Sequence, residues 1–273
     1  MSGESTADTP VELRNPHAGG PFLLVCEHAS SHIPDSYGGL GLDAAARSSH
    51  IAWDPGALAV ADEMARLLDA PLVASRVSRL LYDCNRPPEA PSAVPEESEI
   101  YRIPGNRGLP EEARRARAEL YYFPFRAALA GAVEAHAARA GGRAGLPAIV
   151  TVHSFTPVYR GVARQVEIGI LHDEDARLAE AMLAAAAQAQ TGLVVRRNEP
   201  YGPRDGVTHT LREHALPRGL ANVMIEIRND LIASGHDARA MAGRLAGWLE
   251  TALAACRRQA GGEAEEAAPW ARQ

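Results

Sequence analysis

Apolar residues are grouped in short runs that recur along the whole chain. A short apolar run bounded by turn residues is typical of a buried strand, especially where Val and Ile are frequent. On this pattern we predict strands over 22–28, 71–77, 148–153, 166–171, 193–195 and 223–227.

Stretches with helical features lie between several of these runs. Asp54 is placed to cap one helix, and Pro55 suits its first turn. Another stretch opens with acidic residues and closes near Gly192, as helix ends prefer. In the last one, Met241 and Leu245 belong to an apolar repeat with helical spacing. The predicted helices span 54–68, 173–192 and 237–258.

The alternation of strands and helices indicates the fold class. It predicts an α/β fold around a mostly parallel sheet. No linker-like stretch divides the pattern, so we expect one domain over 21–258. The composition of 1–20 and 259–273 predicts flexible ends. The segment 87–104 is rich in proline, and loops of that length are usually functional or mobile.

Charge and composition exclude several classes of protein. The chain has 28 basic and 34 acidic residues, a net charge of −6, and every basic residue is arginine. This balance argues against a nucleic-acid partner, and the absence of lysine excludes Schiff-base and phosphate-loop lysine chemistry. No apolar run is long enough to span a bilayer, and the first residues lack the pattern of a secretory signal. We therefore expect a cytoplasmic protein.

The cysteines give little evidence of chemistry. Cys26, Cys84 and Cys256 are widely spaced and include no CxxC pair, so a disulfide framework and a thiolate zinc site are not predicted. Cys26 has His28 nearby in sequence and is a candidate nucleophile, but a small buried cysteine is the commoner outcome.

Polar residues at the strand ends are the strongest functional signal. Glu27 and His28 end one predicted strand, His153 ends another, and Glu226 lies near the end of a third. Ligand sites of open α/β sheets lie beyond the carboxyl ends of the parallel strands, where these groups can meet. Two histidines and a carboxylate that hold zinc, with a further carboxylate as general base, form a common hydrolytic site.

Each residue also has a structural interpretation. A single histidine at a strand end is often only hydrogen-bonded, and Asp54 before Pro55 is often only a helix cap. His32 follows His28 at a spacing used by helical metal ligands, although Pro34 disfavours a helix there.

Seven blocks of sequence together resemble the N-formylglutamate amidohydrolase family, over about 21–232. The blocks are LLVCEHASSHIP, HIAWDPGALAVADEMA, RLLYDCNRPP, TVHSFTPVYRG, VEIGILHD, RRNEPYGPRDGVTHTL and NVMIEIRNDLI. The family looks related to the zinc-dependent exopeptidases and aspartoacylases. The resemblance therefore implies their fold (phosphorylase/hydrolase-like), a three-layer α/β/α arrangement around a mixed sheet.

The resemblance also implies roles for individual residues. VHSF is similar to the segment that supplies the last zinc ligand, which places His153 in that role. DCNR is similar to an Asn-Arg pair that grips a substrate carboxylate, which falls on Asn85 and Arg86. IEIRND is similar to the segment with the catalytic glutamate, which is Glu226 here.

The carboxylate ligand departs from the wider pattern. The exopeptidases use His-x-x-Glu, whereas His28 is followed by Ala29, Ser30 and Ser31. We favour Asp54 as the ligand, with Glu27 as its rival. Adjacent residues on a strand point to opposite faces, so Glu27 and His28 cannot easily share one metal. Glu27 is then expected to orient a ligand or a neighbouring loop.

Arginines are the candidates for binding a substrate carboxylate. The guanidinium of Arg86 can form two parallel hydrogen bonds with a carboxylate, or Arg86 can be a solvated surface residue. Arg228 can take a second carboxylate or pair with a neighbour such as Asp230. Arg164 and Arg160 are further candidates.

A loop over 199–210 precedes the strand of Glu226. Its glycines and prolines predict an irregular segment, and such loops cover the substrate in the related exopeptidases. His209 and Tyr201 can contact substrate from there, or can belong to an ordinary exposed turn. Both 87–104 and 199–210 are candidate lids.

These observations predict a zinc-dependent amidohydrolase that cleaves a small N-acyl amino acid, with N-formyl-L-glutamate as the leading substrate. The ion is Zn²⁺ or another divalent transition metal, held by His28, Asp54 and His153. The alternatives are a deacylase of another N-acyl amino acid, a carboxypeptidase-like hydrolase, or a metal-binding or ligand-binding protein without catalysis on the same fold. Neither a nucleic acid nor a membrane is an expected partner. The oligomeric state stays open.

Overall fold

A mixed sheet of seven strands forms the centre of the computed structural model, which describes residues 9–139 and 147–266. Its strand order is β1-β3-β2-β6-β11-β9-β10. The strands of this sheet are β1 (Val11–Arg14), β2 (Phe22–Cys26), β3 (Leu72–Ser75), β6 (Ala148–Phe155), β9 (Ile168–Leu171), β10 (Val195–Arg197) and β11 (Asn222–Arg228). Two small hairpins lie outside this sheet. One consists of β4 (Glu97–Ser98) and β5 (Tyr101–Arg102), and the other consists of β7 (Val158–Tyr159) and β8 (Val162–Ala163).

The sheet is mostly parallel, as the sequence predicts. The central strands β3, β2, β6 and β11 run in the same direction, and β9 pairs with β10 in parallel. Two pairs are antiparallel, β1 with β3 and β11 with β9. The fold is therefore α/β with a mostly parallel mixed sheet.

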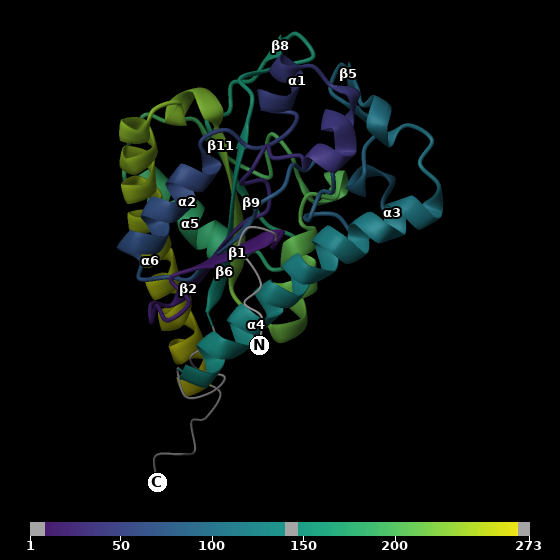
Figure 1. The fold of residues 1–273 in the computed structure, drawn as a ribbon. Coiled ribbons are helices and arrows are strands. Elements are labelled where there is room, and N and C mark those ends of the chain that lie inside the picture. The colour runs from purple at the N-terminus through teal and green to yellow at the C-terminus, as the bar shows by residue number, and fades with distance from the viewer. Residues whose placement is uncertain (1–8, 140–146, 267–273) are drawn as a thin grey trace.

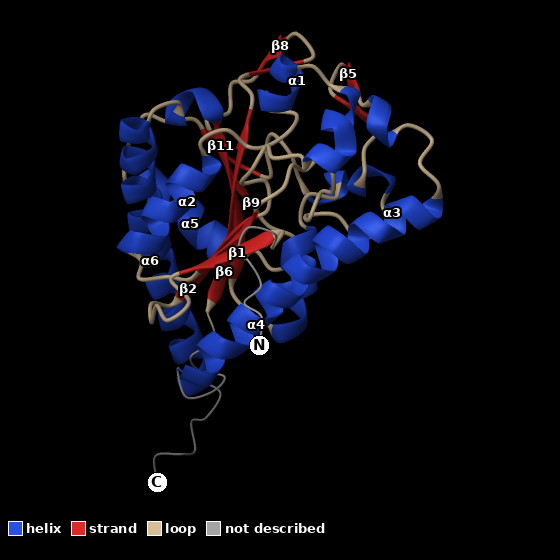
Figure 2. Cartoon of the chain, viewed as in Figure 1, coloured by secondary structure: helices blue, strands red, loops and turns tan. Residues whose placement is uncertain are grey.

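Helices lie on both sides of this sheet (Figure 1), and Figure 2 separates them from the strands by colour. Helices α2, α5 and α6 are on one side, and α3 and α4 are on the other. The helices are α1 (Ala44–Ser48), α2 (Ala57–Leu67), α3 (Glu111–Arg117), α4 (Phe123–Arg139), α5 (Arg177–Gln188) and α6 (Gly235–Glu266). A π-helical turn, η4 (Ala118–Tyr122), joins α3 to α4, and a second one is η7 (Leu211–Ala215).

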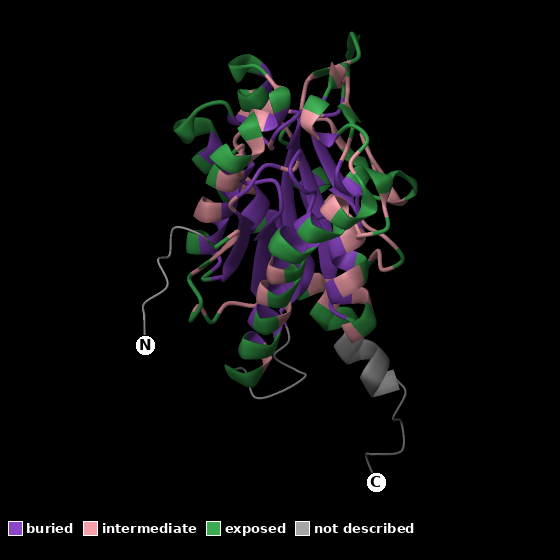
Figure 3. Cartoon of the chain, turned by 45° about the vertical axis from the view of Figure 1, so that its right-hand side comes forward, coloured by how far each residue is buried: buried purple, intermediate pink, exposed green. Residues whose placement is uncertain are grey.

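The face under α2, α5 and α6 is a continuous apolar core, which we call face A. Alternate residues of each strand point to it, for example Val150 and Val152 of β6 and Ile225 of β11. Small and aliphatic helix residues such as Ala61 and Leu245 fill the space against them. Figure 3 shows the sheet as the most buried part of the chain.

The opposite face, face B, is apolar only along part of its length. Near the amino ends of the strands, Leu23 and Ile149 pack with Phe125 and Leu129 of α4. At the carboxyl ends the same face carries Glu27, His153 and Glu226, all buried. His153 pairs with Glu226 in the β6–β11 register, and the β2–β6 register continued by two residues places Glu27 beside His153. Three neighbouring parallel strands thus present one row of ionisable side chains.

Several sequence-based expectations differ from the structure. Val11–Arg14, which we assigned to a flexible end, is the edge strand β1, because its main chain pairs with β3. Helix α6 continues to Glu266, past the predicted limit at residue 258. Residues 1–8 and 267–273 of the predicted flexible ends lie outside the described residues, and 15–20 form the turn between β1 and β2.

Asp54 does not cap α2. Gly56 occupies the N-cap position with a positive φ of 81°, and no side chain caps the helix there. A Cβ at Gly56 would lie 2.7 Å from the main-chain oxygen of Ile232, so only glycine fits this turn. The carboxylate of Asp54 is therefore free to point elsewhere.

Candidate metal centre

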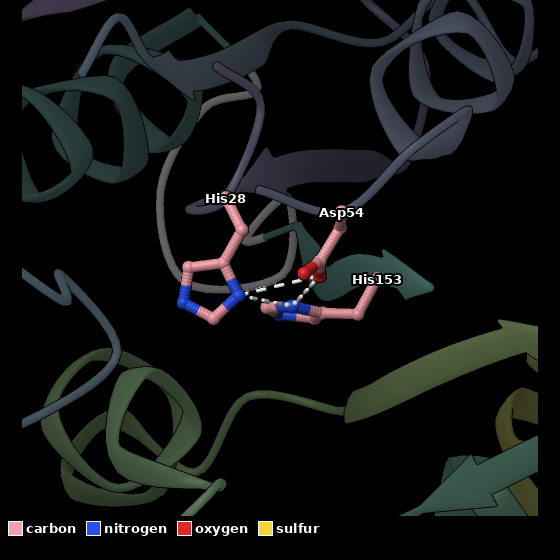
Figure 4. A group of neighbouring side chains, drawn as sticks. All are labelled: His28, Asp54 and His153. Atoms are coloured by element: carbon pink, nitrogen blue, oxygen red, sulfur yellow. Dashed lines mark hydrogen bonds and ion pairs between the residues drawn. The ribbon is translucent and has the colours of Figure 1, made fainter. Parts of the chain in front are cut away.

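Three side chains from distant parts of the chain meet at the carboxyl end of the sheet (Figure 4). His28 follows β2, Asp54 precedes α2, and His153 belongs to β6. A main-chain hydrogen bond from Asp54 N to His28 O, 3.0 Å long, holds the first two segments together. All three residues are buried.

The geometry of this cluster fits a metal ion. His28 Nδ1 and His153 Nδ1 are 3.2 Å apart, and they lie 3.2 and 2.9 Å from Asp54 Oδ2. Ligand atoms at the usual zinc distances of about 2.0–2.1 Å and at tetrahedral angles lie about 3.3 Å from one another. The three atoms therefore have the spacing of three corners of a tetrahedral site.

The opposite nitrogen of each histidine faces a second carboxylate. His28 Nε2 lies 2.7 Å from Asp83 Oδ1, and His153 Nε2 lies 3.1 Å from Glu27 Oε2. Carboxylates in this position fix the ring orientation and the tautomer of metal-binding histidines. With a proton on each Nε2, three lone-pair atoms converge at the centre of the cluster. Such an arrangement is stable when a metal ion lies between these atoms, or when His153 Nδ1 carries a proton and donates it to Asp54 Oδ2, as the raised pKa of His153 favours.

The surrounding charges shift the protonation of these groups. Burial raises the pKa of Asp54, but the charges and hydrogen bonds of His28 and His153 outweigh it and lower that pKa below its usual range. Burial lowers the pKa of His153, but Glu27 and Asp54 raise it well above the ordinary value. The carboxylate of Asp54 is therefore ionised in the cluster, as a carboxylate that binds a metal must be.

Glu226 is a buried carboxylate beside the cluster whose pKa is raised, whereas the pKa values of Asp54 and Asp83 are lowered. Its side chain lines the cavity next to His153, and its Oε2 is buried without a hydrogen-bond partner among the described residues. Burial raises the pKa of Glu226 to about 7, although His153 partly offsets the shift. A carboxylate with such a pKa can accept and release a proton near neutral pH.

A cavity of about 330 Å³ opens over the cluster. Arg79 lies on its wall, and its guanidinium pairs with Asp83 at 2.8 Å and with Asp54 at 3.5 Å. Other lining residues are His50, Ile51, Ser98, Glu99, Ser154, Phe155, Thr156, Tyr159, Tyr201, Asp205, Val207 and Met224. The cavity is small, and charged or aromatic groups form most of its wall.

Asn85 and Arg86 also line the cavity, but they use their polar groups differently. Asn85 Nδ2 donates to Val207 O, and Asn85 Oδ1 accepts from Thr210 N at 3.0 Å. Both ends of its amide therefore bind the loop that follows Gly202. Arg86 Nη1 donates to the main-chain oxygens of Asn85 and Gly206, which leaves its Nη2 and Nε available to a ligand.

The other predicted substrate-binding residues lie outside this cavity. Arg228 pairs with Asp230 at 2.8 Å and with Glu167 at 3.3 Å. His209 Nε2 lies 2.8 Å from Tyr122 Oη, in a separate groove beside α3.

Arg164 stands behind the cavity wall. Its guanidinium carbon is 4.6 and 4.8 Å from the ring centres of Tyr159 and Tyr201. Its Nη2 donates to Tyr201 Oη at 2.9 Å.

The structure also locates His32 and Cys26, the residues for which the sequence left other interpretations open. His32 is exposed and lines a different groove from the metal cluster. Cys26 is buried on face A, and burial raises the pKa of its thiol well above the ordinary value. An unreactive buried cysteine therefore fits the structure.

Sequence reasoning missed Asp83 and Arg79. Arg79 and Asp83 are four residues apart and come shortly before Asn85 and Arg86 in the sequence. This spacing is the signal that could have indicated an ion pair between Arg79 and Asp83.

Comparison with known proteins identifies relatives of the chain. The family model described as N-formylglutamate amidohydrolase matches residues 20–233. No curated protein matches the sequence. None of the helices in the described part of the chain is long and apolar enough to cross a membrane.

Two solved structures are similar to this one. The gene product Atu2144 from Agrobacterium tumefaciens is 56% identical, with a TM-score of 0.87, and the match covers 91% of this chain and 96% of that chain. An N-formylglutamate amidohydrolase from Ralstonia eutropha JMP134 is 20% identical, with a TM-score of 0.60, over 92% and 99% of the two chains. The second likeness concerns the fold alone.

Proposed function

Because the chain belongs to the N-formylglutamate amidohydrolase family, we propose that it hydrolyses the amide bond of a small N-acyl amino acid at the His28–Asp54–His153 cluster. N-formyl-L-glutamate, which gives formate and glutamate, is the reference substrate. We also propose that the fold is the three-layer arrangement of the zinc exopeptidases, which helices on both sides of the sheet support.

The cluster is proposed to hold Zn²⁺ or another divalent transition metal. Such an ion supplies Lewis-acid polarisation of the acyl oxygen and lowers the pKa of water to about 7. The nitrogen and oxygen donors and their spacing of 2.9–3.2 Å support this assignment. The hydrogen bond between Asp83 and His28 Nε2 supports the orientation that points Nδ1 of His28 inwards, and the ion-pair contact of Glu27 with His153 Nε2 supports the same orientation of His153.

Glu226 is proposed as the general base and acid. Its carboxylate takes a proton from the attacking water and then delivers it to the departing amine. Its position beside His153, its unpartnered Oε2 and its pKa of about 7 support this role. A protein on this fold without catalysis would be expected to turn this side chain away from the cluster or pair it with a cation.

Two arginines complete the proposed site. Arg79 lies beside the metal ligand Asp54, where its positive charge can stabilise the negative charge that develops on the acyl oxygen. Arg86 is proposed to bind the substrate carboxylate through its available Nη2 and Nε. Asn85 acts as a positioning residue, since its amide holds the loop at Val207 and Thr210.

The observation that carries this proposal is the buried triangle of two Nδ1 atoms and one carboxylate oxygen beside Glu226. The test measures amino-acid release from a panel of N-formyl amino acids, N-formyl-L-glutamate included. Chelator-treated protein is assayed with and without added Zn²⁺, and bound metal is quantified by elemental analysis. Activity that returns with zinc is the expected result. Tight zinc binding without release from any member of the panel would contradict the proposed reaction.

A further inference from the structure

The metal cavity offers one uncommitted guanidinium. Arg79 is paired with Asp83 and Asp54. Arg86 forms no ion pair within 4 Å in the described residues: its Nη1 donates to two main-chain oxygens, and its charge acts on Asp83 only at longer range. A substrate carboxylate therefore has one favourable place to bind in this cavity.

The remaining arginines near the site cannot supply a second place. Arg228 is held by Asp230 and Glu167 and does not line the cavity. Arg164 lies against the rings of Phe155, Tyr159 and Tyr201, and Arg160 lies against the ring of Tyr159. These aromatic residues line the cavity, whereas neither arginine does. A second substrate carboxylate would face aromatic rings at this wall.

The rim of the cavity carries fixed negative charge. Glu99 lines the cavity at the β4–β5 turn, and its side chain is only 11% exposed. Its Oε2 lies 2.7 Å from His50 Nε2, and its Oε1 accepts from Arg160 N at 2.8 Å. Glu99 has a positive φ of 55°, so the backbone turns sharply to place this carboxylate inward. Two segments that are distant in sequence, at His50 and at Arg160, therefore hold the side chain of Glu99 at one position.

Asp205 adds a second acidic group to the same lining. Its Oδ2 accepts from Gly202 N at 2.8 Å, in the loop that Asn85 and Arg86 hold. A carboxylate placed near Glu99 or Asp205 would meet like charge, and the cationic group beside Glu99 in the lining, His50, is already paired with Glu99. Such a placement is costly in a small, partly closed cavity.

We infer that this site selects an N-acyl amino acid with a single carboxylate and an uncharged side chain, and that Glu99 is the residue that discriminates against a second carboxylate. The α-carboxylate binds Arg86, and the side chain lies against the aromatic wall. This inference rests on the proposed amidohydrolase function. It predicts that glutamate, with two carboxylates, is not the preferred amino acid.

The decisive pair of substrates is N-formyl-L-glutamine and N-formyl-L-glutamate, because the two have nearly the same size and differ in charge. We expect kcat/KM to be about 10-fold or more higher for the glutamine derivative, the effect of one unpaired buried charge. Higher kcat/KM for the glutamate derivative would overturn the inference. Hydrolysis of neither, nor of any other N-formyl amino acid, would instead overturn the proposed function.

The role of Glu99 is tested by Glu99→Gln, which keeps the size of the side chain and removes its charge. The glutamine-to-glutamate ratio of kcat/KM is expected to fall by roughly 3- to 10-fold, mainly through better use of the glutamate derivative. Asp205→Asn is expected to lower the ratio less, because Asp205 is more exposed than Glu99.

Glu97→Gln is the matched control. Glu97 lies on the same hairpin, is largely exposed, and is absent from the cavity lining. Its substitution should leave both kcat/KM values unchanged. If Glu99→Gln left the ratio at its original value while the protein kept its thermal stability, Glu99 would not be the discriminating residue.

Discussion

The two faces of the central sheet bury side chains of different chemistry. Face A packs aliphatic strand residues against small and aliphatic side chains of α2, α5 and α6. Face B has the same strands and the same degree of burial, yet it carries Glu27, His153 and Glu226 in one row. Hydrophobic burial supplies stability on the first face, whereas buried charge on the second face lowers it.

This difference indicates that folding stability depends mainly on face A and that the reaction rate depends mainly on face B. Removing Glu226 or changing its charge is expected to affect reaction rate more than folding. Removing an aliphatic side chain from face A is expected to do the reverse. Substitutions on the two faces therefore test the separation directly.

Glu226→Gln should have the largest effect. Loss of the general base is expected to lower kcat by about 10²–10⁴-fold, while the midpoint of thermal unfolding stays equal or rises because a buried charge is removed. Steady-state kinetics and calorimetry on metal-loaded protein measure both quantities. Glu167→Gln, an isosteric change outside the cavity, is the control. A kcat within a few-fold of the parent would exclude Glu226 as the base.

Leu245→Ala tests face A. Leu245 is fully buried in α6, and truncation of such a leucine costs about 2–5 kcal/mol of unfolding free energy. Urea denaturation should show this loss, while kcat of the folded fraction stays unchanged. A large fall in kcat at full folding would show that the two faces are coupled.

His214 tests the part of face B that lies under η7. Burial lowers the pKa of this histidine from 6.5 to about 4, so the unfolded chain binds a proton in that pH window and the folded chain does not. The free energy of unfolding should therefore fall as pH drops from 6.5 to about 4, by about 2–3 kcal/mol from this group. His214→Gln should flatten that slope relative to the exposed His236→Gln variant. Equal slopes in the two variants would remove His214 as the cause.

Asp83→Asn should have the smallest effect of the four. Loss of the carboxylate behind His28 is expected to weaken metal affinity by about 10–100-fold, because the ring is no longer held in one tautomer and orientation. Competition with a metal chelator gives the affinity. Asp62→Asn, which removes a carboxylate from an ion pair with Arg14 at the sheet edge, is the control. Equal affinity in both variants would assign Asp83 a purely structural role.

Much of face A could be predicted from the sequence. Each predicted apolar run overlaps a strand of the main sheet and each predicted helix formed, because continuous apolar runs and helical repeats are local signals. The run 193–195 is the weakest match, since it shares only Val195 with β10. Strand β1 was missed because VELR is short and half charged, and its pairing with β3 depends on a distant segment. Helices α3 and α4 were not predicted. The π-helical turn between them and the buried Arg117 interrupt the amphipathic pattern.

The site was predicted in part. The sequence and the family resemblance brought His28, Asp54 and His153 together as candidates, and the structure places them in one cluster. Their role as ligands stays a prediction. Glu27 was expected to orient a ligand, and it lies 3.1 Å from His153 Nε2. Asp83 could not be read from the sequence, since its contact with His28 joins two segments 55 residues apart. The pairing of Arg228 with Asp230 and Glu167 likewise depends on where β11 ends.

The row of Glu27, His153 and Glu226 has a consequence for the accuracy of folding. Its members stand side by side only because β2, β6 and β11 pair in one register. A slip of one residue in β6 would turn His153 into the apolar face and bring Val152 or Ser154 into the row. Such a misfolded chain could retain a similar helical and strand content and yet lose the cluster. The amount of metal bound per chain would therefore measure the fraction of molecules whose strands pair in the native register. A circular dichroism spectrum, which reports only helix and strand content, could not measure this fraction.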